Sequence, residues 1–249
     1  MHLSTSRKAL FTLAALGLAA FAAHPASAQS LITNGSFEAN SFNTYPGYVG
    51  GDNGFITGWT SNNNNSGLNP AAGDPFDNNG VSPDGGNVAF LQSADGSTAT
   101  PTTLYQQLTG LTIGQVYSVS FYDNSRANTA IPTLSLLVGG TQSNVPAGPG
   151  QTTIVGGTSI YSSAITPVGG SKPYNFITTS FTANDTSEYL EFSAARPADG
   201  GDATALIDGV KVVSAAPEPS QIGMLASAAL GLGALAVKAR RRTTAAQAA

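Results

Sequence analysis

The sequence predicts an all-β fold, a two-sheet antiparallel jelly-roll sandwich flanked by an N-terminal signal helix and a C-terminal single membrane-spanning helix. Three observations predict it. Short segments with alternating apolar and polar residues recur through 29–215, as expected of strands that bury one face. Glycine, asparagine, proline and aspartate separate these segments, which is typical of turns. Each end of the chain carries an uncharged apolar run, which is typical of targeting and anchoring segments.

The amino end has the three parts of a secretory signal peptide. Arg7 and Lys8 precede an apolar run over 9–23, and Ala26 and Ala28 form an Ala-x-Ala site. We therefore expect cleavage after Ala28 and export of the remaining chain. An uncleaved anchor helix over the same residues is the alternative.

The body of the chain, 29–215, has the length of one domain. Alternation is clearest where Tyr117, Val119 and Phe121 are separated by serines. Two stretches, 40–86 and 139–173, are predicted to be mostly loop, and in the second only 153–155 and 160–161 are expected to be able to pair. Strands are expected at 31–37, 88–91, 104–108, 117–121, 134–138, 176–181, 189–193 and 206–213.

Composition excludes several classes of function. The chain has no cysteine, and both histidines, His2 and His24, precede the expected cleavage site. The body therefore cannot use a Ser-His-Asp or Cys-His mechanism or bind zinc through histidine. It contains four basic and thirteen acidic residues, a formal charge of −9. Such a body repels nucleic acid, so no nucleic-acid partner is expected, and it attracts metal cations.

The carboxyl end has the form of a membrane anchor. Sixteen uncharged residues, 222–237, follow Pro217, Glu218 and Pro219 and stop at a cluster of three arginines. Sixteen helical residues span about 24 Å, somewhat less than a hydrocarbon core of about 30 Å. The arginines place the end of the chain in the cytoplasm and the body outside. A buried core helix is the alternative interpretation.

The Pro217-Glu218-Pro219 motif, the apolar helix and the arginine cluster follow one another in the chain. In this order they resemble the PEP-CTERM sorting signal of Gram-negative bacteria, with Arg240, Arg241 and Arg242 as the cluster. The resemblance covers 216–242 and leaves 243–249 as a cytoplasmic tail. It implies transient anchoring in the inner membrane with the body in the periplasm. It also implies cleavage by an exosortase-type protease and transfer to the cell surface or extracellular matrix.

A second resemblance covers most of the body. An ordered set of short motifs is similar to galactose-binding-like jelly rolls, which include carbohydrate-binding modules. The motifs are Asn34-Gly35-Ser36-Phe37-Glu38, Ile56-Thr57-Gly58-Trp59, Gly114-Gln115-Val116-Tyr117 and Leu206-Ile207-Asp208-Gly209-Val210. The resemblance implies a structural calcium held by Glu38 and Asp208.

The strand phase and expected burial of Glu38 and Asp208 also favour a calcium site. Terminal strands of a jelly roll can lie side by side, which would bring Glu38 and Asp208 together. Asp208 shares strand phase with Leu206, Val210 and Val212, the expected inward set. A buried carboxylate is costly unless it is paired or metal-bound, and calcium prefers oxygen ligands. Capping of loops or contact with water is the alternative.

Aromatic residues are the candidates for ligand binding. Trp59, the only tryptophan, is expected in the core because large aromatic rings are usually buried. Loop aromatics are the better stacking platforms for a sugar ring, because their exposure needs an explanation. The candidates are Tyr45, Tyr48, Phe76, Tyr161 and Tyr174.

Together these observations predict an exported, surface-sorted and non-catalytic protein of the extracellular polysaccharide or biofilm matrix that binds carbohydrate or matrix. No catalytic residue is predicted. A structural surface protein without a discrete ligand is one alternative. A glycoside-active enzyme is another, and it would need two facing carboxylates in an open cleft.

Overall fold

A computed structural model describes residues 29–40, 49–50, 56–63, 65–70, 80–93, 101–144, 152–198 and 200–215. The expected signal peptide and sorting signal lie outside these ranges. Within them, no helix has the length and apolar character needed to cross a membrane. The location and processing of the chain therefore stay predictions.

The described residues form strands joined by turns and loops. In chain order these are β1 (Val49–Gly50), β2 (Thr60–Ser61), β3 (Ser66–Pro70), β4 (Asn87–Ser93), β5 (Thr102–Thr109), β6 (Val116–Ser125), β7 (Thr133–Val138), β8 (Thr141–Asn144), β9 (Thr152–Val155), β10 (Thr158–Ala164), β11 (Asn175–Thr182), β12 (Ser187–Ala195) and β13 (Ala203–Ser214).

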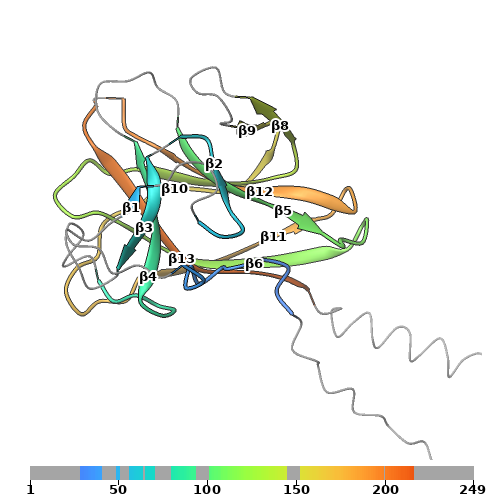
Figure 1. Cartoon of the computed structure of the whole chain (residues 1–249), viewed down its shortest axis with the longest axis horizontal. Helices are drawn as coiled ribbons and strands as arrows, with labels where there is room; N and C mark the ends of the chain where they lie inside the picture. Colours follow the sequence, from blue (N-terminus) through green and yellow to red (C-terminus); the bar gives the residue numbers. More distant parts are fainter. Residues whose placement is uncertain are drawn as a thin grey trace, which may run out of the picture.

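These strands build two sheets that face each other (Figure 1). Sheet A has the order β1-β3-β4-β13-β6-β11, sheet B has the order β10-β7-β12-β5-β2, and β8 and β9 form a separate hairpin. All pairings between these strands are antiparallel. The predicted all-β, two-sheet antiparallel sandwich is confirmed, and its strand order is consistent with a jelly roll.

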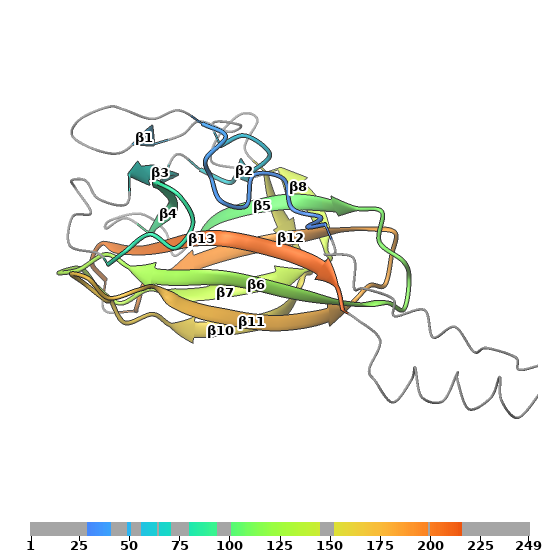
Figure 2. The same cartoon turned by 90° about the horizontal axis from the view of Figure 1, so that it is seen from below.

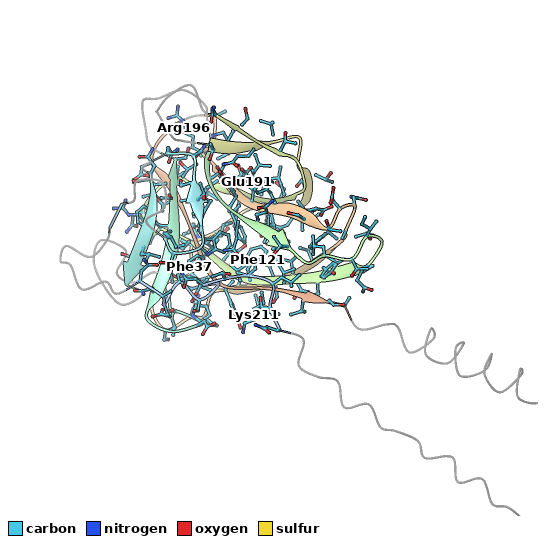
Figure 3. The ribbon with its side chains drawn as sticks, turned by 45° about the vertical axis from the view of Figure 1, so that its right-hand side comes forward. Phe37, Phe121, Glu191, Arg196 and Lys211 are labelled. Carbon is cyan, nitrogen blue, oxygen red and sulfur yellow. The ribbon has the colours of Figure 1, made fainter. Side chains whose placement is uncertain are left out.

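The core between the sheets follows the predicted alternation. Tyr117, Val119 and Phe121 of β6 are buried in it. The rings of Phe121 in sheet A and Phe192 in sheet B meet edge-on, with centroids 5.1 Å apart. Trp59 is 3% exposed and belongs to the same core, so its interpretation as a core ring is confirmed. Figure 3 shows Phe121 inside the sandwich.

Strand β13 changes phase within its length, contrary to the prediction. Leu206 lies in a second, smaller apolar cluster on the outer face of sheet A, whereas Val210 and Val212 lie in the main core. The register of β13 on β6 shifts after Asp208, and Gly209 has a φ of +57°. Such a β-bulge inserts an extra residue and reverses the faces of those that follow. Asp208 therefore lies on the outer side with Leu206. The second cluster consists of Val88, Phe90, Tyr174 and Leu206, with Tyr122 packed against it.

The segment 31–37 is not a strand, although it lies where a first strand was expected. Asn34 and Phe37 have φ values of 53° and 61°, and left-handed residues interrupt an extended strand. Even so, Leu31 N–H donates to the Val212 carbonyl at 2.8 Å, and Val210 N–H donates to the Gly35 carbonyl at 2.9 Å. The predicted proximity of the first and last segments of the body is thus confirmed.

The two stretches predicted to be mostly loop contain more pairing than expected. The first holds β1, β2 and β3, and the second holds β8, β9 and β10. Many of their residues are Ser, Thr, Asn or Gly, so they lack the apolar alternation that marks a strand in sequence. Their pairing depends on hydrogen bonds to neighbouring strands, such as β3 with β4 and β2 with β5.

Candidate functional site

Glu38 and Asp208, the predicted calcium ligands, both bind the segment 82–87 that leads into β4. The Oε1 atom of Glu38 accepts the N–H of Gly86 at 2.7 Å and the N–H of Asn87 at 2.6 Å. A Cβ atom added to Gly85 would lie 2.5 Å from the Glu38 carboxyl carbon. The exposed Glu38 side chain therefore lies directly against this segment.

Asp208 contacts the same segment from the outer side of sheet A and is nevertheless 0% exposed. Its Oδ2 atom accepts the Asp84 N–H at 3.0 Å and the Ser82 hydroxyl at 3.2 Å, and its Oδ1 atom accepts the Gly209 N–H at 2.7 Å. Burial raises the pKa of Asp208 to about 7, against the lowering effect of these hydrogen bonds.

The two carboxylates bind different residues of one segment, and the groups that they contact there are hydrogen-bond donors. Calcium takes about six to eight oxygen ligands, including carbonyl oxygens. Within the described ranges, no three His, Cys, Asp or Glu side chains gather as a metal group would require. A cation would have to replace N–H donors at Glu38 and Asp208, so calcium binding stays a prediction.

Removal of calcium tests that prediction. If calcium binds at Glu38 and Asp208, a chelator should lower the melting temperature by several degrees, because a ligand at about 100 times its Kd contributes about 2.7 kcal/mol. At this size, each kcal/mol moves the midpoint by about 2–4 °C. Thermal melts with and without EDTA measure this, and Glu38→Gln should abolish the response. An unchanged midpoint in the unsubstituted protein would dismiss the calcium site.

The structure describes two of the five predicted stacking rings, and neither stands free in a loop. Tyr161, in β10, is half-buried, packs edge-on against Phe121 at 5.4 Å and donates its hydroxyl to Asp123 Oδ2 at 2.7 Å. Burial and the Asp123 carboxylate raise the pKa of Tyr161 above its usual value. Tyr174 is only 4% exposed. The expected exposure is therefore wrong for Tyr174, which packs in the second apolar cluster, whereas Tyr161 is half-buried on a strand rather than in a loop. Tyr45, Tyr48 and Phe76 lie outside the described residues.

An aromatic pair of one half-buried and one exposed ring lies elsewhere, on the outer face of sheet A. The rings of Tyr122 in β6 and Phe176 in β11 are opposite each other across the strands, with centroids 4.9 Å apart. Phe176 is 59% exposed, although it is a large apolar side chain on a strand. Figure 2 looks onto this side of the sandwich, where β13, β6 and β11 run side by side.

Hydroxyl groups continue the same face away from the aromatic pair. Ser120 and Thr178 form the next cross-strand pair and Ser118 and Ser180 the one after, each pair about 7 Å further along the strands. Lys211 of β13 pairs with Ser120 and is exposed. We call this surface the aromatic–hydroxyl face. It consists of Ser118, Ser120, Tyr122, Phe176, Thr178, Ser180 and Lys211.

The bulge in β13 makes room for the aromatic pair. A Cβ atom on Gly209 would lie 3.0 and 3.2 Å from two ring carbons of Tyr122. The Tyr122 ring therefore lies directly over the bare backbone of Gly209, and it also packs on the second apolar cluster. Phe176 is thus supported by a ring that is itself held in place, which makes the pair a rigid platform.

Tyr122 and Phe176 are not among the predicted binding residues, although the strand pattern contains a signal for them. Tyr122 follows the alternation of β6 on the same phase as Ser118 and Ser120, and Phe176 shares its phase with Thr178 and Ser180. A large aromatic residue on the polar phase of a strand is the unusual feature, because that phase normally faces water.

Another buried acid, Glu191, lies on the opposite side of the molecule from Asp208. Glu191 of β12 is 4% exposed beneath the β8–β9 hairpin, and its Oε2 atom accepts the Ile154 N–H at 3.1 Å. Burial raises the pKa of Glu191 to about 7, against the lowering effect of the hydrogen bond from the Ile154 N–H. Figure 3 shows Glu191 and Lys211 on opposite sides of the sandwich. Nothing in the sequence marked Glu191 as buried, because its polar strand phase normally faces water.

No protein-family model and no curated protein matches this chain. Among solved structures, the chain is similar in fold to a Stig cyclase, Fisc from Fischerella sp. TAU, in complex with an indole compound. That similarity has a TM-score of 0.50 at 18% identity and covers 77% of this chain and 100% of the cyclase. A cyclase from Fischerella sp. TAU in complex with 4-(1H-indol-3-yl)butan-2-one gives a TM-score of 0.50 at 17% identity, over 75% and 97% of the two chains.

The carbohydrate-binding module TmCBM61, in complex with β-1,4-galactotriose, has a TM-score of 0.43 at 14% identity, over 75% of this chain and 99% of the module. At these identities the cyclase similarities show the shared fold alone. The function must therefore be argued from the aromatic–hydroxyl face and the placement of the acids.

Proposed function

We propose that residues 29–215 form a non-catalytic carbohydrate-binding domain, and that a polysaccharide lies on the aromatic–hydroxyl face. The exposed Phe176 ring, 59% exposed on a rigid strand beside Tyr122, is the observation that supports the proposal most directly. The C–H face of a sugar ring is apolar and packs on an aromatic face, while its hydroxyls need hydrogen-bond partners. The serine and threonine rows next to the ring supply such partners.

The placement of the acids supports a binding role over hydrolysis. The two carboxyl groups whose pKa is raised to about 7 are Glu191 and Asp208. Glu191 belongs to sheet B beneath the β8–β9 hairpin, and Asp208 lies on the outer side of sheet A. Hydrolysis of a glycoside by paired carboxylates needs about 5–9 Å between them on either side of one bond. Two groups on opposite outer sides of a sandwich cannot act on the same glycosidic bond.

Delivery to the cell surface is part of the same proposal. The signal peptide over 1–28 exports the chain, and an exosortase-type protease acts at Pro217-Glu218-Pro219 before the protein joins the extracellular polysaccharide or biofilm matrix. The mass of the mature protein recovered from the cell surface checks both cleavages. A mature protein that keeps residues 222–237 would contradict the proposed sorting.

Replacing Phe176 by alanine is expected to weaken binding to polysaccharide at least about tenfold, because truncating a central aromatic contact commonly costs about 2 kcal/mol. Stability should change by less than about 1 kcal/mol, since the ring is mostly exposed. Affinity electrophoresis and a glycan array with purified 29–215 measure the binding.

Ile113→Ala is the matched control, because Ile113 is also exposed, at 64%, but lies outside the aromatic–hydroxyl face. Its binding should equal that of the unsubstituted protein. Unchanged binding in Phe176→Ala would remove the proposed face. A flat response of the unsubstituted protein across all glycans would favour a structural surface protein without a discrete ligand.

A further inference from the structure

We infer that the aromatic–hydroxyl face takes an acidic polysaccharide, with a carboxylate-bearing sugar residue at Lys211 next to the sugar that stacks on Phe176. This inference rests on the proposed function and names the class of its ligand. It starts from the only charged side chain on that face.

Lys211 lies in register with the hydroxyl rows. It pairs with Ser120, which in turn pairs with Thr178, so the three residues form one row across β13, β6 and β11. The row of Tyr122 and Phe176 is two residues away along the strands, a distance of about 7 Å. Diagonal neighbours at this spacing are within reach of a long side chain. The ammonium group and the aromatic pair can therefore contact adjacent sugar residues.

The surroundings of Lys211 leave its charge available to a ligand. In the described part of the chain Lys211 forms no ion pair; the ion pair found there joins Arg126 to Asp202 at 3.0 Å. Three acids adjoin the aromatic row: Asp84, beside Gly209, Asp208, and the buried Asp123, whose carboxylate accepts hydrogen bonds from Tyr161 and Asn175. Asp208 is 0% exposed, and its oxygens accept hydrogen bonds from 82–84 and Gly209. Lys211 lies further along β13 than Asp208, toward the Ser214 end of the strand.

Lys211 is one of few basic residues in an acidic body, so its position on the aromatic–hydroxyl face bears on which polysaccharide this face prefers. The body has a formal charge of −9, with four basic residues against thirteen acidic ones, so its long-range field repels a polyanion. At physiological ionic strength the Debye length is about 8 Å. Charges at that distance or further are therefore screened, and a direct contact between Lys211 and a carboxylate decides the preference.

Paired polysaccharides test the inference. Alginate and polygalacturonate are each compared with their carboxyl-reduced forms, which keep the chain and remove the charge, at about 150 mM salt. We expect the unsubstituted protein to bind an acidic form about fivefold more tightly than its reduced form, the size of one exposed ionic contact. Lys211→Gln should remove that preference and leave binding to the reduced form unchanged. Lys211→Arg should restore it.

Lys172→Gln is the matched control, because Lys172 is also exposed but lies outside the three rows. It should keep the preference for the acidic form. Equal binding of acidic and reduced forms that is still lost in Phe176→Ala would overturn the inference and leave the proposed function standing. Binding of no polysaccharide by the unsubstituted protein would overturn both.

Discussion

Replacing Trp59 by alanine is expected to destabilise the protein by about 3–5 kcal/mol. The ring is 3% exposed in the main core, and its centroid lies 5.6 Å from Phe37 and 6.2 Å from Phe192. Its indole N–H donates to the Asn34 carbonyl at 3.1 Å, so the side chain also holds the turn near the amino end. Truncation removes apolar contacts on both sides and leaves a cavity between the sheets. Urea unfolding followed by circular dichroism measures the loss.

Phe176→Ala is the comparison for this prediction, because it removes an aromatic ring that is 59% exposed. Its cost should stay below about 1 kcal/mol. Trp59→Phe should fall between the two, since it keeps a ring but removes the donor to Asn34. If Trp59→Ala cost no more than Phe176→Ala, the placement of Trp59 in the core would be wrong.

Replacing Gly35 by alanine is expected to destabilise the protein by about 3 kcal/mol or more, at the upper end of overpacking effects. A Cβ atom there would lie 2.0 Å from the Val210 carbonyl oxygen and 3.1 Å from a side-chain carbon of Ile32. The oxygen belongs to the backbone of β13 and cannot rotate away. The amino-terminal segment must therefore separate from β13, which breaks the hydrogen bond from Val210 N–H to the Gly35 carbonyl.

Gly86→Ala is the matched control, because a Cβ atom at Gly86 would meet nothing within 4 Å. The same chemical change should there be close to neutral or slightly stabilising. Hydrogen exchange at Leu31 and Val210, whose amides join the two segments, should accelerate in Gly35→Ala and stay slow in Gly86→Ala. Equal stability of the two variants would falsify the close approach.

Most strands could be predicted from alternation, because burial of one face imposes a period of two on the sequence. This held over 117–121 of β6, 134–138 of β7 and 190–194 of β12, whose inward residues are apolar and whose intervening ones are mostly polar. It failed for β3, where Ser66, Gly67, Leu68 and Asn69 are all buried. A strand buried on both sides with small and polar residues has no alternation to detect.

The candidate site was predicted only in part, because the phase of a strand can change within its length. The neighbourhood of Glu38 and Asp208 could be expected from the order of terminal strands, and both residues do bind the segment 82–87. The side of the sheet on which Asp208 lies could not be predicted from the sequence, because the bulge at Gly209 reverses the phase of β13. The loop rings expected to be exposed included Tyr174, which instead fills the second apolar cluster.

The sequence alone determined the features that depend on local pattern and composition. These are the β-sandwich class, the burial of Trp59 and a body without histidine or cysteine. The tertiary structure alone decided which side chains share a surface. Tyr122 and Phe176 are 54 residues apart, yet they meet because β6 and β11 pair in one register. Register and bulges are set by packing of the whole sandwich, which a local pattern does not record.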